Sequence, residues 1–523
     1  MSYQSLGFLL FSAIVMLVYY AVPGKYQKHV LLAASIVFYA MAGIKYIPFL
    51  AATTAVAFIC GKKIGAIYEE EAQLLKACAV PAEKKAVRAS QKKKALGILR
   101  IALLVTAGLL VVCKYTGFIL ENICALFSIP QLTGFRMIVP LGISFYTFMA
   151  VGYMLDIYWK RYSAEKEFIP FAAFLTYFPH VVQGPIDRYN EFRKQLPGDE
   201  KLRFDAARIT RGLQLTMWGF FKKLVIADRL NIFVNTVYGD YTAYRGLIFV
   251  IATALYSIQI YADFSGCIDI VSGISEAMGI KLRKNFDHPY FSRTMPEFWR
   301  RWHISLGEWF KDYIYYPVSV SNLSRKLKKN KKSKKAGELA AACLPVTAVW
   351  LLTGIWHGAS WNFVIWGLFH CLLIVLSILC ADMNRNLTDR LHINTDSRPW
   401  RLWQMTRTFI LCGVGRVFFR APDMPAVAGI FRNTFSGLGL EFVAGKALFK
   451  YGVNRYHFYA AMVAILILWI VDLMQEKFSL RDAIAKRNIV IRWSIVFIGL
   501  FAIIIFGAYG PGYDASSFIY EQF

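Results

Sequence analysis

The stretch that decides the fold is Val346–Leu379, which reads VTAVWLLTGIWHGASWNFVIWGLFHCLLIVLSIL. It contains no Asp, Glu, Lys or Arg. A run of about 20 mostly apolar residues is long enough to cross the hydrocarbon core of a bilayer as a helix. The small residues Gly358, Ala359 and Ser360 interrupt the run, and they allow a helix break and the close approach of a substrate. The stretch therefore predicts membrane-embedded helices on both sides of His357.

Apolar runs of this kind recur along the whole chain of 523 residues. The chain is 57% hydrophobic with a mean hydropathy of +0.43, and 18% of its residues are charged, against about a quarter in a soluble domain. We expect an all-α, polytopic integral membrane protein with about ten to twelve membrane segments, and a soluble globular fold is excluded. The other apolar runs include Leu6–Val22, Ile101–Leu126, Leu247–Ile274, Tyr459–Val471 and Trp493–Phe506.

The net charge of +27 raises the question of nucleic-acid binding, but the basic residues lie in loops between the apolar runs. Lys62–Arg100 holds ten basic residues against four acidic ones, and Arg325–Lys335 (RKLKKNKKSKK) has eight basic residues and no acidic one. Such loops mark the cytoplasmic side of a membrane protein, where anionic lipids attract them. We interpret Glu69–Lys94, in the first loop, as a solvated helical face and a topology signal, not as a site. No folded module with interleaved aromatic and basic residues is visible, so nucleic-acid binding is set aside.

The same charge rule gives a path through the membrane. It places Lys25–His29 and Lys62–Arg100 inside, and it places Met1–Ser5 and Ala508–Phe523 outside, because these ends carry no basic residue. Both termini are therefore predicted to be extracellular. Leu6–Val22 has no basic region before it and no cleavage site of small residues after it, so we interpret it as a retained membrane anchor.

The segment Thr294–Tyr316 has a different pattern. Thr294 and Glu297 have the spacing of a capping box, and Pro296 stands near the first turn, so a helix is expected to begin there. Apolar side chains then recur at intervals of three and four residues, which is the spacing of one helical face. We expect one amphipathic helix lying along the membrane interface. Its apolar face consists of Phe298, Trp302, Leu306, Trp309, Tyr313 and Tyr316.

Two of the eight histidines are candidate catalytic residues. His357 lies among small residues in the decisive stretch, and His303 lies in the amphipathic segment with Trp299 one turn before it. Ionisable side chains among apolar spans are costly and are functional candidates by default. A neutral imidazole can act as a general base near neutral pH. The alternative is a hydrogen-bonded core histidine, and we expect His180 and His370 to be packing residues of that kind.

The remaining polar features have structural interpretations. Asp263, in the run IYADFSG, can line a polar cavity, pair with an arginine or cap a helix, and we favour a structural pairing slightly. The nine cysteines lie mostly in apolar runs and form no CxxC pair, which favours small buried hydrophobic residues over disulfides or zinc ligands. The sequence has no GxSxG, P-loop, HExxH or Gly-rich dinucleotide-binding motif. We therefore predict no metal site and no bound cofactor.

Six motifs occur in order between about Pro140 and Asp423: FYTFMAVGYMLDIYW, FPHVVQGPIDRY, YADFSG, NFDHPYFSRTMPEFWRRWHISLGEWFKDYIYYPV, LTGIWHGASWNFVIWGLFH and GRVFFRAPD. Together they resemble the bacterial membrane-bound O-acyltransferases, and specifically their alginate O-acetylation branch. The resemblance implies a helical bundle with amphipathic or re-entrant helices, and acyl transfer through a tunnel that crosses the membrane. It implies that His357, in the WHG motif, is catalytic and that His303, in RRWH, is the second active-site position.

The resemblance also implies which residues support the tunnel, and it shows where this sequence differs from the family pattern. Ala262 and Cys267 stand where aromatic residues are common in the family, and Arg416 stands where tryptophan is frequent, which bears on substrate shape more than on activity. The residues expected to line or support the tunnel are Trp299, Trp302, Asp263, Trp356 and Asn362.

The function implied by the resemblance is O-acylation of an extracellular polysaccharide. Residues 1–523 would form one integral membrane domain in the bacterial cell membrane, with N-terminal spans in 1–136, the acyltransferase core in 137–423 and C-terminal spans in 424–523. The donor would be a cytoplasmic thioester, acetyl-CoA in the first place and an acylated carrier protein as the alternative. The implied partners are an extracellular or membrane-anchored esterase-like O-acyltransferase and the polysaccharide synthesis machinery.

The C-terminal hexapeptide FIYEQF resembles the aromatic C-terminal motif of the same branch. In a related system, the D-alanylation of teichoic acid, a similar tyrosine on a small partner protein is thought to hold the acyl group. This likeness makes Tyr520 a candidate acyl relay. The alternative is that Tyr520 is an aromatic anchor at the membrane interface. Glu521 stands where the motif usually has a hydrophobic residue.

Two alternative functions stay open on the sequence. One keeps the chemistry and transfers D-alanine from a carrier protein to teichoic acid; the C-terminal tyrosine motif within this chain favours acetylation over it. The other is a transporter or flippase for a polymer precursor, which the WHG and RRWH contexts and the absence of an internal repeat disfavour. Hydrolysis of an acyl thioester by the purified protein would distinguish an acyltransferase from a transporter.

Overall fold

The computed structural model describes residues 1–129, 137–329, 333–437 and 454–509. In this part of the chain the secondary structure is helical, and the only strand-like pairing is an isolated bridge between Phe286 and Trp302. Seven of the described helices are long and apolar enough to cross a membrane. They are α3 with the turn before it (Ile44–Ala77), α4 (Pro81–Phe127), α10 (Leu247–Ala277), α15 (Lys334–His357), α16 (Trp361–Leu379), α20 (Arg455–Gln475) and α22 (Ile489–Phe506). The prediction of an all-helical integral membrane protein is confirmed. The predicted apolar run Leu6–Val22 forms a shorter helix, Leu6–Ala21.

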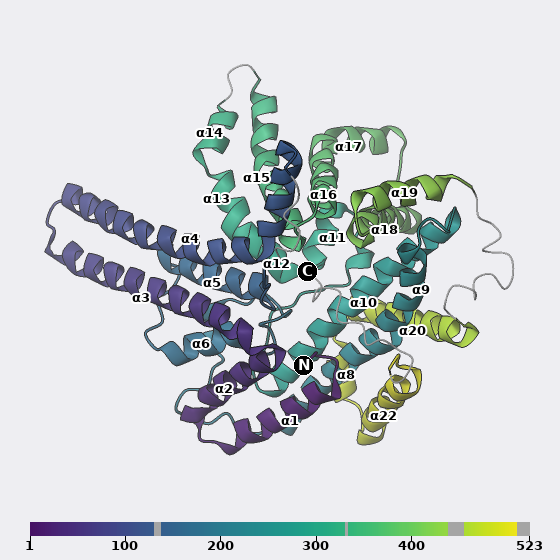
Figure 1. Ribbon diagram of the computed structural model, residues 1–523, viewed down its shortest axis with the longest axis horizontal. Helices are drawn as coiled ribbons and strands as arrows, with labels where there is room; N and C mark the ends of the chain where they lie inside the picture. Colours follow the sequence, from purple (N-terminus) through teal and green to yellow (C-terminus); the bar gives the residue numbers. More distant parts are fainter. Residues whose placement is uncertain (130–136, 330–332, 438–453, 510–523) are drawn as a thin grey trace. The chain divides into compact units, whose positions relative to one another are not determined.

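The chain divides into two compact units, with boundaries within α8 (Ala206–Phe220), within the last two turns of α10 (Leu247–Ala277) and after Arg283. The first unit comprises residues 1–213 and 271–283. Its helices, in purple and blue in Figure 1, are α1 (Leu6–Ala21), α2 (Gly24–Ala42), α3 (Ile47–Ala77), α4 (Pro81–Phe127), α5 (Ile143–Tyr158), α6 (Phe168–Thr176), α7 (Tyr189–Arg193) and the first part of α8 (Ala206–Phe220).

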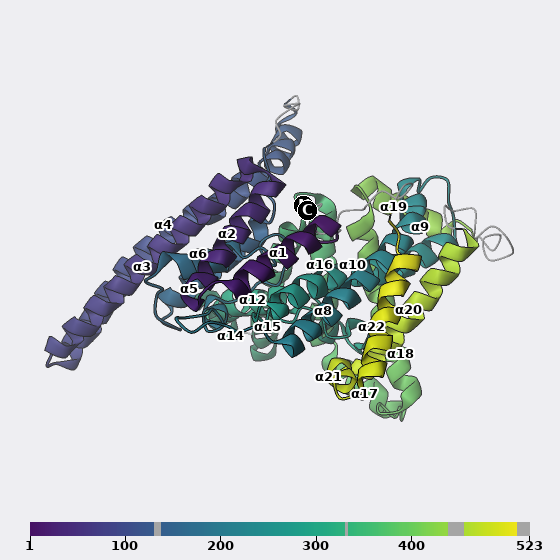
Figure 2. The same ribbon diagram turned by 90° about the horizontal axis from the view of Figure 1, so that it is seen from below.

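Helices α3 and α4 form a long antiparallel hairpin, which both views show (Figures 1 and 2). Proline stands in the first turn of each helix, where a missing N–H costs no helical hydrogen bond. The 47 residues of α4 correspond to a length of about 70 Å at 1.5 Å per residue. The apolar half of α4 begins after Arg100. The segment Glu69–Lys94, predicted to be helical and solvated, is divided between the end of α3, the turn at residues 78–80 and the start of α4. The hairpin therefore continues well beyond the apolar sequence that can lie in lipid.

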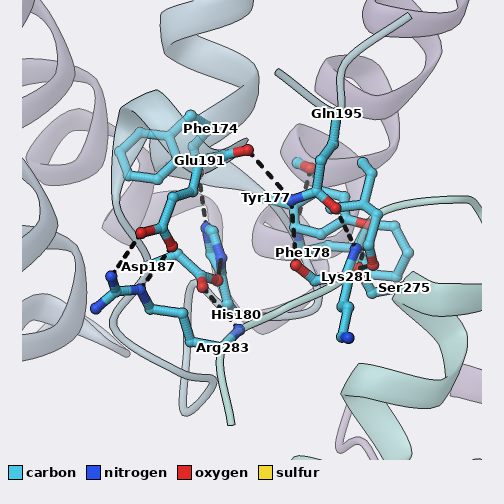
Figure 3. Close-up of polar contacts among 12 residues, drawn as sticks. Phe174, Tyr177, Phe178, His180, Asp187, Glu191, Gln195, Ser275, Lys281 and Arg283 are labelled. Atoms are coloured by element: carbon cyan, nitrogen blue, oxygen red, sulfur yellow. Dashed lines mark hydrogen bonds and ion pairs between the residues drawn. The ribbon is translucent and has the colours of Figure 1, made fainter. Parts of the chain in front are cut away.

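A buried histidine organises the interior of the first unit (Figure 3). The His180 Nδ1 lies 2.9 Å from Asp187 Oδ2, and its Nε2 lies 2.7 Å from the backbone oxygen of Phe174. The other oxygen of Asp187 accepts the backbone N–H of Arg283 at 3.0 Å, and the Arg283 guanidinium pairs with Glu191 at 2.7 Å. Because both ring nitrogens have hydrogen-bond partners, His180 is a structural residue, as its sequence context indicated.

The second unit comprises residues 214–270 and 284–523. A π-helical segment, Phe221–Ala227, follows α8, and a second one, Lys311–Tyr315, follows α12. The unit contains the second part of α8 and residues 247–270 of α10 (Leu247–Ala277). Its other helices are α9 (Asp228–Gly239), α11 (Met295–Arg301), α12 (Ile304–Phe310), α13 (Tyr316–Ser319), α14 (Asn322–Lys328), α15 (Lys334–His357), α16 (Trp361–Leu379), α17 (Ala381–Arg390), α18 (Arg398–Arg420), α19 (Met424–Phe435), α20 (Arg455–Gln475), α21 (Leu480–Ala485) and α22 (Ile489–Phe506).

Helices α15 and α16 approach each other closely through glycines. A Cβ on Gly354 would lie 2.5 Å from the backbone oxygen of Phe363, and a Cβ on Gly367 would lie 2.6 Å from that of Trp350. Small residues of this kind let membrane helices pack backbone to backbone. The contact fixes the two halves of the decisive stretch against each other, on either side of the break at His357.

The prediction of one continuous amphipathic helix over Thr294–Tyr316 is wrong in one respect. The helix begins as expected, because the Thr294 side chain accepts the N–H of Glu297 at 3.2 Å. It ends at Arg301, and Trp302 has extended backbone because it forms the bridge to Phe286. His303 then takes a left-handed conformation with φ of 48° before α12 begins. This break comes from a pairing with a distant segment, which the helical periodicity cannot report.

Candidate active site

His357 is the last residue of α15, and the helix break that follows it is built around a glycine. Gly358 is extended, and Ser360 is the N-cap residue of α16. A Cβ at Gly358 would lie 2.3 Å from the ring of Phe363, so no larger residue fits without a shift. The structure thus confirms the helix break predicted from the small residues of this stretch.

Aromatic rings surround the His357 imidazole, which is 4% exposed. The ring centroid of Trp366 lies 4.8 Å from that of the imidazole, and the ring centroid of Phe419, in α18, lies 5.2 Å from it. Both rings are nearly perpendicular to the imidazole. Trp356 lies at 4.8 Å. Three helices therefore converge on His357, since Trp356 belongs to α15, Trp366 to α16 and Phe419 to α18.

His303 occupies the break between α11 and α12 and is 3% exposed. Its ring lies 4.8 Å from that of Phe264 in α10 and 5.9 Å from the indole of Trp356. Burial lowers the pKa of the His303 imidazole to about 3. The ring is therefore neutral at physiological pH, and it can donate one hydrogen bond and accept another. A left-handed conformation is uncommon outside glycine, and such outliers cluster at functional sites.

The two candidate histidines come together around one side chain. The Trp356 indole contacts both His303 and His357, although 53 residues separate the two along the chain. The sequence alone could not bring them together, because a basic segment lies between them.

The predicted supporting residues adjoin this pair in different ways. Trp299 packs against Trp350, Trp366 and His370, with ring centroids 4.7, 5.6 and 4.9 Å away. Asn362 donates its side-chain N–H to the backbone oxygen of Ala421 at 2.8 Å and so ties α16 to the end of α18. His370 lies in the aromatic cluster around Trp366, 5.0 Å from its ring, as expected for a packing residue.

Trp302 contacts a buried arginine. The Arg416 guanidinium lies 4.4 Å from the centroid of the Trp302 ring, and Arg416 is 2% exposed. In the described part of the chain no carboxylate lies within 4 Å of it. A guanidinium stacked on an indole gains a cation–π attraction, which is stronger away from water. The aromatic wall of the site therefore carries a buried positive charge in addition to its histidines.

Asp263 pairs with lysine, not with an arginine. The Lys223 Nζ lies 2.7 Å from Asp263 and 2.8 Å from Asp228, and all three side chains are buried. The neighbouring Lys222 pairs with Asp269 at 2.7 Å. Sequence reasoning missed this network, although two consecutive lysines at the end of an apolar run were a visible signal. Each buried charge offsets part of the desolvation penalty of its partner, and removal of one partner would leave an uncompensated buried charge.

Two further predictions concern the C-terminal tyrosine and a metal site. Tyr520 and the rest of the C-terminal motif lie outside the described residues. Within the residues that the structure covers, no group of three or more His, Cys, Asp or Glu side chains could hold a metal ion.

The sequence was compared with known proteins. The family model described as "MBOAT, membrane-bound O-acyltransferase family" matches residues 160–419, a range that contains both His303 and His357. The chain is 30% identical over 430 residues to "Probable alginate O-acetylase AlgI" of Pseudomonas putida, an alignment that covers 82% of this chain and 78% of the relative. It is 27% identical over 439 residues to "Peptidoglycan O-acetyltransferase" of Helicobacter pylori, covering 79% and 75%. It is 29% identical over 258 residues to "Teichoic acid D-alanyltransferase" of Streptococcus thermophilus, covering 47% and 59%.

Proposed function

The chain belongs to the membrane-bound O-acyltransferase family, and from that premise we propose that it moves an acetyl group from a cytoplasmic thioester across the membrane for O-acylation of an extracellular polysaccharide. Membership of the family makes the protein an O-acyltransferase of a membrane. The acetyl group, the direction of transfer and the polysaccharide acceptor are the proposal. Relatives named for O-acetyl transfer align with about four fifths of this chain, which supports the acetyl group.

One observation carries the proposal: the two imidazoles of His303 and His357 meet at the Trp356 indole in a buried, aromatic site. Acyl transfer needs a base that takes a proton from the acceptor hydroxyl as its oxygen attacks the thioester carbonyl. A second neutral imidazole can orient the acceptor or polarise the carbonyl. The burial of both rings excludes water, which would otherwise hydrolyse the thioester.

In the proposed step, His357 accepts the proton of the acceptor hydroxyl. The hydroxyl oxygen forms a bond to the acyl carbon, and the carbon–sulfur bond of the thioester breaks. The proton then passes from His357 to the departing thiolate, so that the products are an O-acyl ester and a free thiol. His303 contributes a hydrogen bond to the carbonyl or to the acceptor while remaining neutral, in keeping with its low pKa.

We propose Tyr520 as a relay that carries the acyl group before it reaches the polymer. A free tyrosine phenol has a pKa near 10, so a nearby base can activate such a group, and an aryl ester is a more reactive donor than an alkyl ester. Substitution of Tyr520 by Phe keeps the ring and removes the nucleophile. Loss of polymer acylation in Tyr520→Phe is the expected result, and acylation at the wild-type rate would mean that Tyr520 is only an interface anchor.

The second candidate function is D-alanyl transfer from a carrier protein to teichoic acid. Similarity to a relative named as a teichoic acid D-alanyltransferase favours it, but that alignment covers 47% of this chain. A transporter or flippase is set aside, because the family is one of acyltransferases. The proposed partners remain an extracellular or membrane-anchored esterase-like transferase and the polysaccharide synthesis machinery.

The test compares the two acyl donors, each supplied separately to the purified full-length protein in liposomes. Radiolabelled acetyl-CoA and D-alanyl carrier protein are each supplied with the wild type and with His357→Ala. We expect thiol release and labelled product with acetyl-CoA, and neither with the variant. Turnover with the D-alanyl carrier protein alone would replace acetyl by D-alanyl transfer, and turnover that is unchanged in His357→Ala would remove the assigned base.

A further inference from the structure

A cavity of about 610 Å³ lies in the first unit, between the hairpin of α3 and α4 and the end of α5. This volume is in the range of small-molecule sites. The cavity does not include His303 or His357, and the proposed acyl transfer makes no use of it. Its walls combine aromatic rings with charged side chains: Tyr68, Glu71, Ala72, Leu75, Arg88, Lys92, Tyr158, Trp159 and Lys160.

One part of the lining is an ion pair between Glu71 and Lys160, whose charges cancel. The Lys160 Nζ lies 2.8 Å from both carboxylate oxygens of Glu71, which is buried, and 4.1 Å from the centroid of the Tyr68 ring. The Tyr68 hydroxyl donates to the backbone oxygen of Tyr158 at 2.8 Å. Lys160 itself has a left-handed backbone with φ of 58°, directly after α5. Such a conformation is unfavourable for lysine and persists only where the surroundings hold it.

The lining also includes two cations that this pair does not neutralise, Arg88 and Lys92. Arg88 and Lys92 are four residues apart on α4 and therefore lie on the same face of the helix. Both are exposed, and neither has a carboxylate within ion-pair distance among the described residues. With Glu71 matched to Lys160, the lining keeps a net charge of +2. The part of the lining that α4 contributes therefore presents positively charged hydrogen-bond donors, while the carboxylate of Glu71 is already paired with Lys160.

We propose that this cavity binds a phosphate group. A guanidinium and an ammonium suit the tetrahedral oxygens of a phosphate, because arginine presents a fork of N–H donors and lysine a point charge. A lining charge of +2 matches a phosphate monoester or a pair of phosphate oxygens better than a single carboxylate. The site does not depend on the proposed acyl transfer, because it shares no residue with it.

Two sources can supply the phosphate. The cavity lies where α3 passes from apolar residues into Glu69–Glu71 and where α5 ends in Tyr158 and Trp159. Aromatic residues at such a transition are typical of the membrane interface, and basic pockets on the cytoplasmic side bind anionic headgroups. A soluble phosphate compound of the cytoplasm could reach the same side chains, because Arg88 and Lys92 lie on the basic half of α4.

The experiment compares two double variants of the full-length protein in uncharged detergent. Arg88→Gln with Lys92→Gln removes both unmatched cations of the cavity. The matched control, Lys93→Gln with Lys94→Gln, removes the same charge from exposed positions of α4 that do not line the cavity. Binding of phosphatidylglycerol is measured by native mass spectrometry, with phosphatidylcholine as the uncharged reference, and binding of inorganic pyrophosphate by calorimetry.

Each basic side chain near an anionic surface is worth about fivefold in affinity, so the cavity variant should bind about thirtyfold more weakly. The control should bind as the wild type does, and Lys92→Gln alone should lose about fivefold, which guards against misfolding of the double variant. Selective loss for phosphatidylglycerol identifies the headgroup, and selective loss for pyrophosphate identifies a soluble compound. The proposal is overturned if the wild type binds neither probe, or if both double variants weaken binding equally.

Discussion

At the scale of single residues, packing decides where His357 points. Three rings from three helices hold the imidazole, so its removal should leave the surrounding helices in place while deleting the base. We predict that His357→Ala inserts into the membrane and folds but loses about two to four orders of magnitude in acyl transfer. Polymer acylation in a deletion strain that carries the variant measures this. Wild-type acylation at normal expression would contradict the assignment.

His303 leads to a prediction about pH. Burial disfavours the charged imidazole, and with a pKa of about 3 the ring stays neutral at every pH above about 4. The acid limb of the pH–rate profile between pH 5 and 8 must then come from another group. We expect His303→Gln to lower the rate, with a few per cent remaining, and to leave the midpoint of the acid limb unchanged. A midpoint that moves or vanishes in His303→Gln would show that His303 itself titrates there.

At the scale of helices, the contact between α15 and α16 depends on the absence of side chains. A Cβ at Gly354 would meet backbone on the neighbouring helix, which cannot move aside as a side chain can. We predict that Gly354→Ala destabilises the protein by about 1–3 kcal/mol through overpacking. Melting temperature in detergent measures this, with Gly108→Ala as the control, because a Cβ there meets nothing within 4 Å. Equal melting temperatures for the two variants would mean that the helices separate without cost.

The helices also show how far sequence reasoning reaches. Local sequence patterns predicted the apolar spans, the N-cap of α11 at Thr294 and the helix break after His357. Each of these features depends on residues that are close together in the chain. The break at His303 depends on a bridge between Phe286 and Trp302, and the partner of Asp263 is a lysine 40 residues away. Contacts across such separations are set by the fold, and a single sequence gives no measure of them. The meeting of the two histidines at Trp356 is of the same kind.

At the scale of the whole molecule, the distribution of charge predicts which side of the membrane each segment faces. Arg325–Lys335 has eight basic residues and no acidic one, which predicts that this segment faces the cytoplasm. We predict that cysteines introduced at Lys328 and Lys335 resist a membrane-impermeant thiol reagent in intact cells and react after the membrane is opened. A cysteine at Ser2, on the predicted outer side, is the matched control. Efficient labelling at Lys328 in intact cells would reverse the orientation.

The long hairpin has a practical consequence for imaging. A protein of 59.6 kDa that is mostly embedded in a detergent belt offers few features by which its particles can be aligned in electron cryomicroscopy. Helix α4 is about 70 Å long, more than twice the thickness of the hydrocarbon core, so its basic half stands clear of the belt. An antibody fragment that binds the turn between α3 and α4 would be held by two paired helices and would act as a rigid fiducial marker. Its epitope would be far from both histidines in the sequence.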